Sequence, residues 1–216
     1  GRQATTIWST SSSGSVVKVT GTVPGGAGQG CAPVTGFTCY GWNGGASLTG
    51  LEYGDRFGGT LTDVAAGGFG GNGFWFHDAT GLSEGSFISV LGNQNNNDFV
   101  FQGNASSGSF DWSHIVLKVT GNTPNGSGGA CLSVIQHMQM NGCFIQLSGG
   151  CQVGSGLAKT GIVVGNGGTD QSIISGTMLN IMLEGDTSTG GTMTDVVINT
   201  AAGFGIDRCN GIMYFQ

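Results

Sequence analysis

The sequence has little charge, little proline and no long apolar run. Only 8% of its 216 residues are charged and three are proline. The six Lys and Arg are scattered singly and the net charge is −6, so no basic patch is present to neutralise phosphates. No apolar run approaches the ~20 residues of a membrane-spanning helix. We therefore expect neither nucleic-acid binding nor membrane insertion.

Cysteine is present without the spacing of a metal site or of a small disulfide-rich domain. No Cys-x-x-Cys pair occurs, and a chain of this length can bury a full core without covalent staples. We expect reduced and mostly buried thiols, and no cofactor or metal is signalled. The cysteines are Cys31, Cys39, Cys131, Cys143, Cys151 and Cys209.

Glycine is abundant, with 45 residues, and apolar residues make up 38% of the chain. The glycines follow no Gly-X-Y period, which excludes collagen, and the apolar content is too high for a disordered chain. No window of 12 residues shows the apolar spacing of an amphipathic helix with caps. The pattern predicts an all-β protein with essentially no α-helix.

One sequence motif recurs along the chain, and it is called here the corner-and-strand phrase. It is a glycine-rich corner followed by a short strand, as in residues 70–78 (GGNGFWFHD). Strand alternation directs Phe74 and Phe76 to one side and Trp75 and His77 to the other. The phrase recurs with first apolar positions at Leu51, Phe74, Phe99, Ile162 and Ile212, which are predicted to point inward. The first two steps between these positions are nearly equal. The two later steps are at least twice as long, so each has room for two or more turns, and a repeat of this kind is typical of a solenoid.

A second kind of strand alternates with this phrase, so each unit contains two or three short strands. These units cannot bury an apolar face alone and must stack on their neighbours. The strands of this second kind are predicted at residues 62–66, 86–92, 134–141, 180–185 and 195–199.

A longer duplication is superimposed on this period. Residues 17–34 share nine identities with residues 117–134, at a constant offset of 100. The segments 22–30 and 122–130 are therefore interpreted as a repeated loop that leaves the stack.

Several phrases resemble the coils of the pectate-lyase-like superfamily of right-handed parallel β-helices, and more narrowly the β-helix domains of bacteriophage tailspike and tail-fibre proteins. They are residues 1–7 (GRQATTI), 36–41 (GFTCYG) and 62–64 running to 73–76. The resemblance implies a single β-helix domain over residues 1–216. In such proteins a cap and one or two coils precede the GRQAT phrase, so we expect a fragment that lacks them. The resemblance also implies side-by-side trimers, with Trp112, Met213 and Phe215 meeting neighbouring subunits.

The outward side of the repeated strand is the candidate binding surface. If the Phe residues point inward, the opposite side contains a ladder of outward residues. Sugar rings stack on aromatic faces and their hydroxyls need fixed polar partners, which this combination of side chains supplies. The ladder contains Glu52, Trp75, His77, Val100 and Gln102, with Tyr40 expected near its edge.

Catalysis would need two carboxyl groups ~5–9.5 Å apart if the reaction is glycoside hydrolysis. The nearest candidates on the ladder are Glu52 or Asp55 paired with Asp78, while Asp98 begins the next strand. A turn position would use Asp just as readily, so the structural role stays open.

The sequence thus predicts a virion tailspike or fibre domain that binds, and in one version cleaves, a bacterial surface polysaccharide. Its expected partners are that polysaccharide, two further copies in a homotrimer and other virion proteins. One alternative is a free secreted polysaccharide hydrolase or lyase. Another is a purely structural virion component without glycan chemistry.

Overall fold

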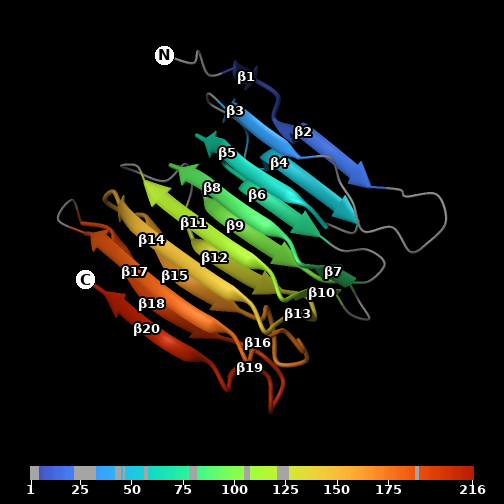
Figure 1. Cartoon of the computed structure of the whole chain (residues 1–216). Helices are drawn as coiled ribbons and strands as arrows, with labels where there is room; N and C mark the ends of the chain where they lie inside the picture. The colour runs from blue at the N-terminus through green and yellow to red at the C-terminus, as the bar shows by residue number, and fades with distance from the viewer. Residues whose placement is uncertain are drawn as a thin grey trace.

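The protein is described by a computed structural model that covers residues 5–21, 33–41, 45, 47–55, 58–77, 82–104, 108–120, 127–187 and 190–216. Within these residues every regular element is a β-strand, and every strand pair is parallel. Parallel neighbours require a crossover between successive strands. The chain makes this crossover by winding into a parallel β-helix of about six turns, as predicted from the sequence (Figure 1).

The strands form three sheets. The eight-stranded sheet contains β1 (Thr5–Ser9), β3 (Val34–Gly41), β5 (Thr60–Gly67), β8 (Phe87–Asn93), β11 (His114–Thr120), β14 (Phe144–Gln152), β17 (Met178–Asp186) and β20 (Asn210–Phe215). The seven-stranded sheet contains β2 (Ser13–Gly21), β4 (Ser47–Asp55), β6 (Asn72–His77), β9 (Asn97–Gln102), β12 (Gly129–Ile135), β15 (Ala158–Val164) and β18 (Thr192–Ile198). The five-stranded sheet contains β7 (Leu82–Glu84), β10 (Gly108–Asp111), β13 (Met138–Asn141), β16 (Ile173–Ser175) and β19 (Gly205–Asp207).

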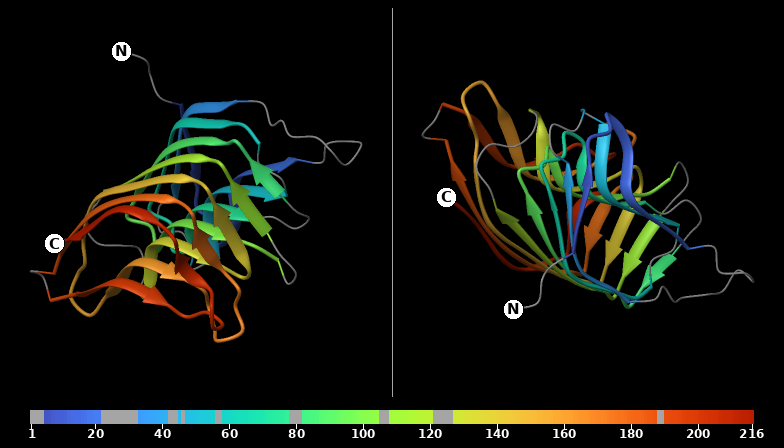
Figure 2. Two further views of the ribbon diagram at one scale, coloured as in Figure 1. Left: turned by 60° about the horizontal axis from the view of Figure 1, so that its bottom comes forward. Right: turned by 90° about the horizontal axis from the view of Figure 1, so that it is seen from above.

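From β5 onward each turn contributes one strand to the eight-, the seven- and the five-stranded sheet, in that order. The turns stack along one axis, with the N-terminal and C-terminal strands at opposite ends of the stack (Figures 1 and 2). Short strands of this kind expose one apolar side each, and the stack buries those sides together.

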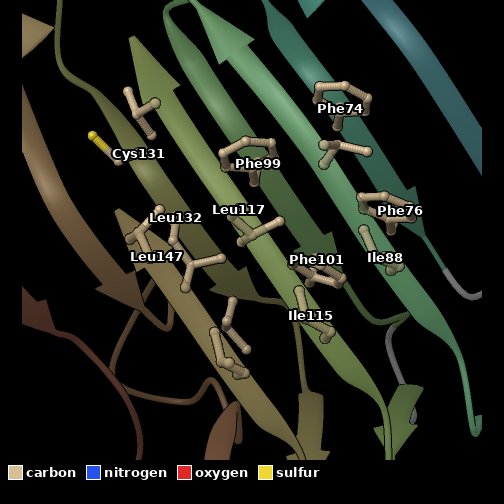
Figure 3. Close-up of a cluster of buried hydrophobic side chains, with 14 of the residues drawn as sticks. Phe74, Phe76, Ile88, Phe99, Phe101, Ile115, Leu117, Cys131, Leu132 and Leu147 are labelled. Atoms are coloured by element: carbon tan, nitrogen blue, oxygen red, sulfur yellow. The ribbon is translucent and has the colours of Figure 1, made fainter. Parts of the chain in front are cut away.

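The predicted inward column is confirmed through most of its length. Leu51 pairs with Phe74 and Phe74 with Phe99, so each of the two short predicted steps is one turn of the coil. The longer step from Phe99 to Ile162 holds two turns, because Leu132 is the rung between them. Stacking follows the register: the ring centroids of Phe74 and Phe99 are 5.4 Å apart (Figure 3).

Ile212 does not belong to this column, and its predicted inward orientation is wrong. It lies on β20 of the eight-stranded sheet, opposite Asn180, and is 65% exposed. The partner of Ile162 is instead Val196 on β18. The local phrase is the same in both places, but the position of a strand within the turn decides which sheet it joins.

Two other sequence interpretations also need correction. The strand predicted at residues 134–141 is interrupted by a corner at Gln136 and His137, whose φ angles are 55° and 62°. The duplicated segments are not structurally equivalent, because Lys18 lies on β2 of the seven-stranded sheet and Lys118 on β11 of the eight-stranded sheet. Residues 22–30 and 122–126 lie outside the described residues.

The glycine corner that begins the phrase serves close packing more than an unusual φ angle. Gly71 and Gly73 do not have positive φ, but a Cβ on Gly71 would lie 2.7 Å from the Leu48 carbonyl oxygen. The Asn-rich segment 93–97 forms the turn between β8 and β9. Its left-handed residue is Gln94, and Asn95 points inward and is fully buried.

The thiols behave as predicted where they are described. Cys39, Cys131 and Cys143 are free and buried, and Cys209 is free and half-buried. Burial raises the pKa of the Cys39 thiol to about 12. Burial also raises the pKa of the Cys143 thiol, to about 11. The buried cysteines therefore pack as small apolar side chains. Cys31 and the side chain of Cys151 lie outside the described part of the chain.

Candidate functional site

The outward side of the seven-stranded sheet brings together most of the predicted binding residues. Lys18 pairs with Glu52 and Glu52 with Trp75, so these side chains lie on three consecutive turns. Two positions further along the strands, His77 pairs with Gln102. Residues in register across adjacent strands are close enough for direct side-chain contact. The predicted ladder is thus present.

Glu52 is the centre of an ionic cluster on this side. Its side chain is only 7% exposed, although it faces outward. The Lys18 ammonium lies 2.6 Å from Oε1, and His77 Nε2 lies 2.9 Å from the same oxygen. Ser15 donates its hydroxyl hydrogen to Oε2. Because an ionised carboxylate only accepts hydrogen bonds, the Nε2 atom of His77 carries the hydrogen and donates it.

These contacts keep Glu52 ionised. Burial alone would raise the pKa of its carboxyl, but hydrogen bonds from Lys18, Ser15 and His77, together with the Lys18 charge, hold the pKa at about 2. A group with such a low pKa is not a proton donor near neutral pH, so Glu52 does not have the properties of the general acid that glycoside hydrolysis needs.

Trp75 and His77 form an aromatic pair next to this cluster. Their ring centroids are 4.2 Å apart and their planes are inclined by 33°. The sequence makes room for this arrangement, because Gly54 is the residue opposite His77, and a Cβ there would lie 3.2 Å from the imidazole ring. The absence of a side chain at position 54 lets the ring reach Glu52.

Amide side chains extend the row toward the following turns. The Trp75 indole Nε1 donates to Gln102 Oε1 at 3.0 Å, and Gln102 Nε2 donates to Gln136 Oε1 at 2.9 Å. Because each amide both donates and accepts, the chain of contacts continues from one turn to the next. The row is named here the outer polar row, and its members are Ser15, Lys18, Glu52, Trp75, His77, Gln102 and Gln136.

Not every predicted site residue belongs to this row. Tyr40 lies on β3 of the eight-stranded sheet, in edge-to-face contact with Trp8 at 5.9 Å, so it is not at the edge of the ladder. The Val100 side chain is buried. Asp78 and the side chain of Asp55 lie outside the described residues, so the predicted carboxylate pair stays a prediction.

Asp98 lies inside the protein. It is fully buried at the beginning of β9 and pairs with Lys159 at 2.6 Å. Alternation of side chains correctly places Phe99 and Phe101 in the core, but it does not predict a carboxylate buried at a corner of the coil.

Sequence reasoning missed Ser15, Lys18 and Gln136. Lys18 lies one full turn before Glu52, and only the length of that turn reveals that the two are neighbours. Gln136 follows β12, where the chain turns out of the seven-stranded sheet. A register for the turns that contain β2 and β12 would have identified both Lys18 and Gln136.

The described residues contain no group of three or more His, Cys, Asp or Glu side chains that could hold a metal ion. None of their elements is a helix with the length and apolarity needed to cross a membrane. Comparisons with protein-family models, with curated proteins and with solved structures find no match to this chain. The fold class that the structure defines is the parallel β-helix.

Proposed function

We propose that this β-helix is the receptor-binding part of a virion tailspike or fibre and that a bacterial surface polysaccharide binds along the outer polar row. The observation that supports this proposal is the continuous row of aromatic, imidazole and amide side chains across adjacent turns. The half-buried Trp75 and His77 rings and the Gln102 and Gln136 amides are its glycan-facing members.

The chemistry of the row suits a sugar chain. Aromatic rings bind the apolar faces of sugars, and amides exchange hydrogen bonds with hydroxyls as both donors and acceptors. Neighbouring strands lie about 4.8 Å apart, so the row offers a new polar partner at each turn along the axis. A linear polymer aligned with that axis would meet several of these partners at once.

Binding is better supported than cleavage. Glu52 is the only predicted catalytic carboxylate whose side chain is described, and its charge is already balanced by the Lys18 ammonium, while Ser15 and His77 donate hydrogen bonds to it. Such a carboxylate fixes the positions of its neighbours. Cleavage, as in the free hydrolase or lyase alternative, would therefore depend on Asp55 and Asp78.

The virion part of the proposal is supported by apolar residues on the surface. Trp112 is exposed, as a subunit-contact role requires. Met213 and Phe215 pair with the buried Ile181 and Leu183, so they lie on the inward side of β20 and do not support a side-by-side contact. Other large apolar side chains are exposed on the outward side of the eight-stranded sheet. This second observation favours a side-by-side trimer, and it would equally serve a purely structural fibre.

The test is binding of the purified chain to a panel of bacterial surface polysaccharides, with measurement of both affinity and polymer length. We expect Trp75→Ala to weaken binding about tenfold, which corresponds to about 1.4 kcal/mol. Arg208→Ala is the control, because the Arg208 side chain is 81% exposed on the corner between β19 and β20 and belongs to neither the outer polar row nor the proposed subunit contacts. It should bind as the wild type does.

Each alternative gives a different result. Equal affinity of Trp75→Ala and wild type would place the glycan elsewhere or nowhere. Shortening of the polymer would support the hydrolase or lyase alternative. No binding to any member of the panel, combined with trimer formation, would support the structural alternative.

A further inference from the structure

A buried cluster of Lys159, Asp98 and Asn95 lies at the corner between the eight- and seven-stranded sheets, away from the outer polar row. The side chains of Asp98 and Lys159 are 0% and 1% exposed, and Asn95 is 0% exposed. Asn95 is in the turn that precedes β9, Asp98 is on β9, and Lys159 is on β15 two turns later.

Glycine residues make the space for this cluster. A Cβ on Gly73 would lie 2.4 Å from Asn95 Nδ2, and one on Gly92 would lie 2.7 Å from Asp98 Oδ1. On the intervening strand β12, the residue opposite Lys159 is Gly129. A Cβ on Gly129 would lie 2.0 Å from the Asn96 carbonyl oxygen, so this glycine lets β12 pack closely against the turn that contains Asn95. The Lys159 side chain extends past β12 to Asp98 on β9.

The carboxylate of Asp98 bridges the amine and the amide. Lys159 Nζ lies 2.6 Å from Asp98 Oδ2, and Asn95 Nδ2 donates to Asp98 Oδ1 at 3.0 Å. Lys159 Nζ also donates to the Asn95 backbone oxygen at 2.9 Å, which holds the amine beside this residue. The backbone N–H of Phe69 donates to Asn95 Oδ1 at 3.1 Å and so polarises the side-chain carbonyl.

This arrangement contains a nucleophile, an acyl acceptor, a proton carrier and a donor for the developing oxyanion. We propose that Lys159 and Asn95 form an intramolecular isopeptide bond, with Asp98 transferring the protons. The reaction needs no cofactor, oxidant or second substrate.

The groups of the cluster supply and accept every proton that the reaction moves. Asp98 takes one proton from the Lys159 ammonium, and the Nζ lone pair attacks Asn95 Cγ while Phe69 N–H stabilises the negative oxygen. Asp98 then transfers its proton to Nδ2 and accepts another from Nζ. The Cγ–Nδ2 bond breaks, ammonia leaves, and the products are a neutral amide and a protonated Asp98.

Burial favours these products. An ammonium and a carboxylate removed from water carry a large desolvation cost, and the reaction replaces both charges by neutral groups. Burial also raises the pKa of the Asp98 carboxyl, against the opposing effects of Lys159 and Asn95, which is consistent with a protonated end state. Asn95 is the favoured acceptor because condensation of Lys159 with Asp98 would consume the proton carrier.

The bond would join turns that are 64 residues apart in sequence. In a solenoid each turn contacts only its neighbours, so unfolding can begin at an end and spread along the stack. A covalent link that spans an intervening turn would stop this spread in the middle of the molecule.

The test is the intact mass of the folded full chain together with a tryptic map. We expect a mass below the sequence value by one ammonia, and resistance of Lys159 to trypsin. The map should contain residues 57–118 joined to residues 119–208, in place of separate peptides 57–118, 119–159 and 160–208. Lys159→Arg should have its full mass and no joined peptide.

A succinimide at an Asn-Gly pair also loses ammonia, but that loss would persist in Lys159→Arg and would join no peptides. A wild-type chain of full mass that is cleaved after Lys159 would overturn the proposal. Loss of water with a link to Asp98 would overturn the assignment of Asn95. The wild-type map decides the question even if Lys159→Arg fails to fold.

Discussion

Asp170 shows how a single side chain fixes a turn of the coil. Its Oδ2 accepts hydrogen bonds from the backbone N–H groups of Gln136 at 2.8 Å and Asn166 at 2.9 Å. Its Oδ1 accepts from His137 N at 2.8 Å and from both the N–H and the hydroxyl of Ser172. Gln136 and His137 both have positive φ, a costly conformation for residues other than glycine. Asp170 therefore stabilises the strained corner of the preceding turn.

We predict that Asp170→Asn lowers the free energy of unfolding by about 2 to 3 kcal/mol, because an NH₂ group would replace an acceptor and face buried N–H donors. Asp207→Asn is the matched control. The Asp207 side chain is 45% exposed and pairs only with the exposed Arg208 in the contacts described, so its loss should cost less than about 0.5 kcal/mol. Urea unfolding at neutral pH measures both changes.

The same substitution should change the response to acid. Burial opposes ionisation of Asp170, but hydrogen bonds from Ser172, His137, Gln136 and Asn166 lower its pKa below the ordinary value. A lowered pKa stabilises the fold above the unfolded-state pKa of about 3.9, and this stability is lost as the pH falls through the folded-state pKa. Wild type should therefore lose stability more steeply in acid than Asp170→Asn. Parallel curves would contradict the role given to this carboxylate.

At this scale the sequence predicted the core residues better than the polar ones. Phe74 and Phe76 follow from strand alternation alone. The ion pair of Glu52 with Lys18 depends on the register between turns, and the buried Asp98 depends on a corner whose shape alternation does not describe. Trp75, His77 and Gln102 of the outer polar row could be predicted because they share one sheet and one side.

Among elements, the corner from the five-stranded to the eight-stranded sheet repeats most regularly. It contains a left-handed residue followed by Ser, Thr or Cys on five successive turns. The left-handed residues are Gly85, Trp112, Gly142, Gly176 and Arg208, and the following residues are Ser86, Ser113, Cys143, Thr177 and Cys209. This pattern could have been found in the sequence, but Trp112 and Arg208 conceal it because left-handed positions usually contain Gly or Asn.

The Ser, Thr and Cys residues that follow the left-handed positions form a column along the stack, and Thr177 illustrates its role. Its hydroxyl lies within donating distance of the Ser175 carbonyl oxygen in its own corner, at 3.0 Å, and of the Met140 carbonyl oxygen on the preceding turn, at 3.3 Å. The same hydroxyl accepts from the backbone N–H of Cys143 on the preceding turn, at 3.2 Å. The column thus links each corner to the one before it.

We predict that Thr177→Val destabilises the protein by about 1 to 2 kcal/mol, because it leaves the buried Cys143 N–H without an acceptor. Thr177→Ser keeps the hydroxyl, and serine already occupies this column at two other turns, so it should cost clearly less. Thermal unfolding followed by circular dichroism compares the pair. If the two variants melted together, the hydrogen bond would not be the source of the effect.

The lengths of the turns explain which strands could be placed correctly from the sequence. The short turns from Leu51 to Phe74 and from Phe74 to Phe99 placed β4, β6 and β9 correctly, since little chain is left over for other structure. Later turns are longer, as from Phe99 to Leu132, and leave more chain between successive strands of the seven-stranded sheet. A corner-and-strand phrase can then begin either a seven-stranded or an eight-stranded position, which is why residues 209–215 were assigned to the wrong sheet.

At the scale of the whole molecule, the outward side of the eight-stranded sheet is unusually apolar. Phe87, Met178, Met182, Ile212 and Tyr214 are all exposed there. A hollow of about 340 Å³ lies over its last strands, and Met182 and Tyr214 line it. Large exposed apolar patches mark interaction surfaces in soluble proteins. This side is therefore the one through which neighbouring β-helices would pack in the proposed trimer.

We predict that Met182→Glu converts the proposed trimer to a monomer in light scattering. Met182 is on β17, between β14 and β20, so a charge there would be buried in the subunit interface but solvated in the monomer. Val197→Glu is the control, because Val197 is an exposed apolar residue on the outward side of the seven-stranded sheet. A stable interface of standard size buries about 800 Å² on each partner, which several exposed side chains of this size can supply. A wild-type monomer would contradict the proposed assembly, and a trimer lost only in Val197→Glu would move the interface to the side assigned to the glycan.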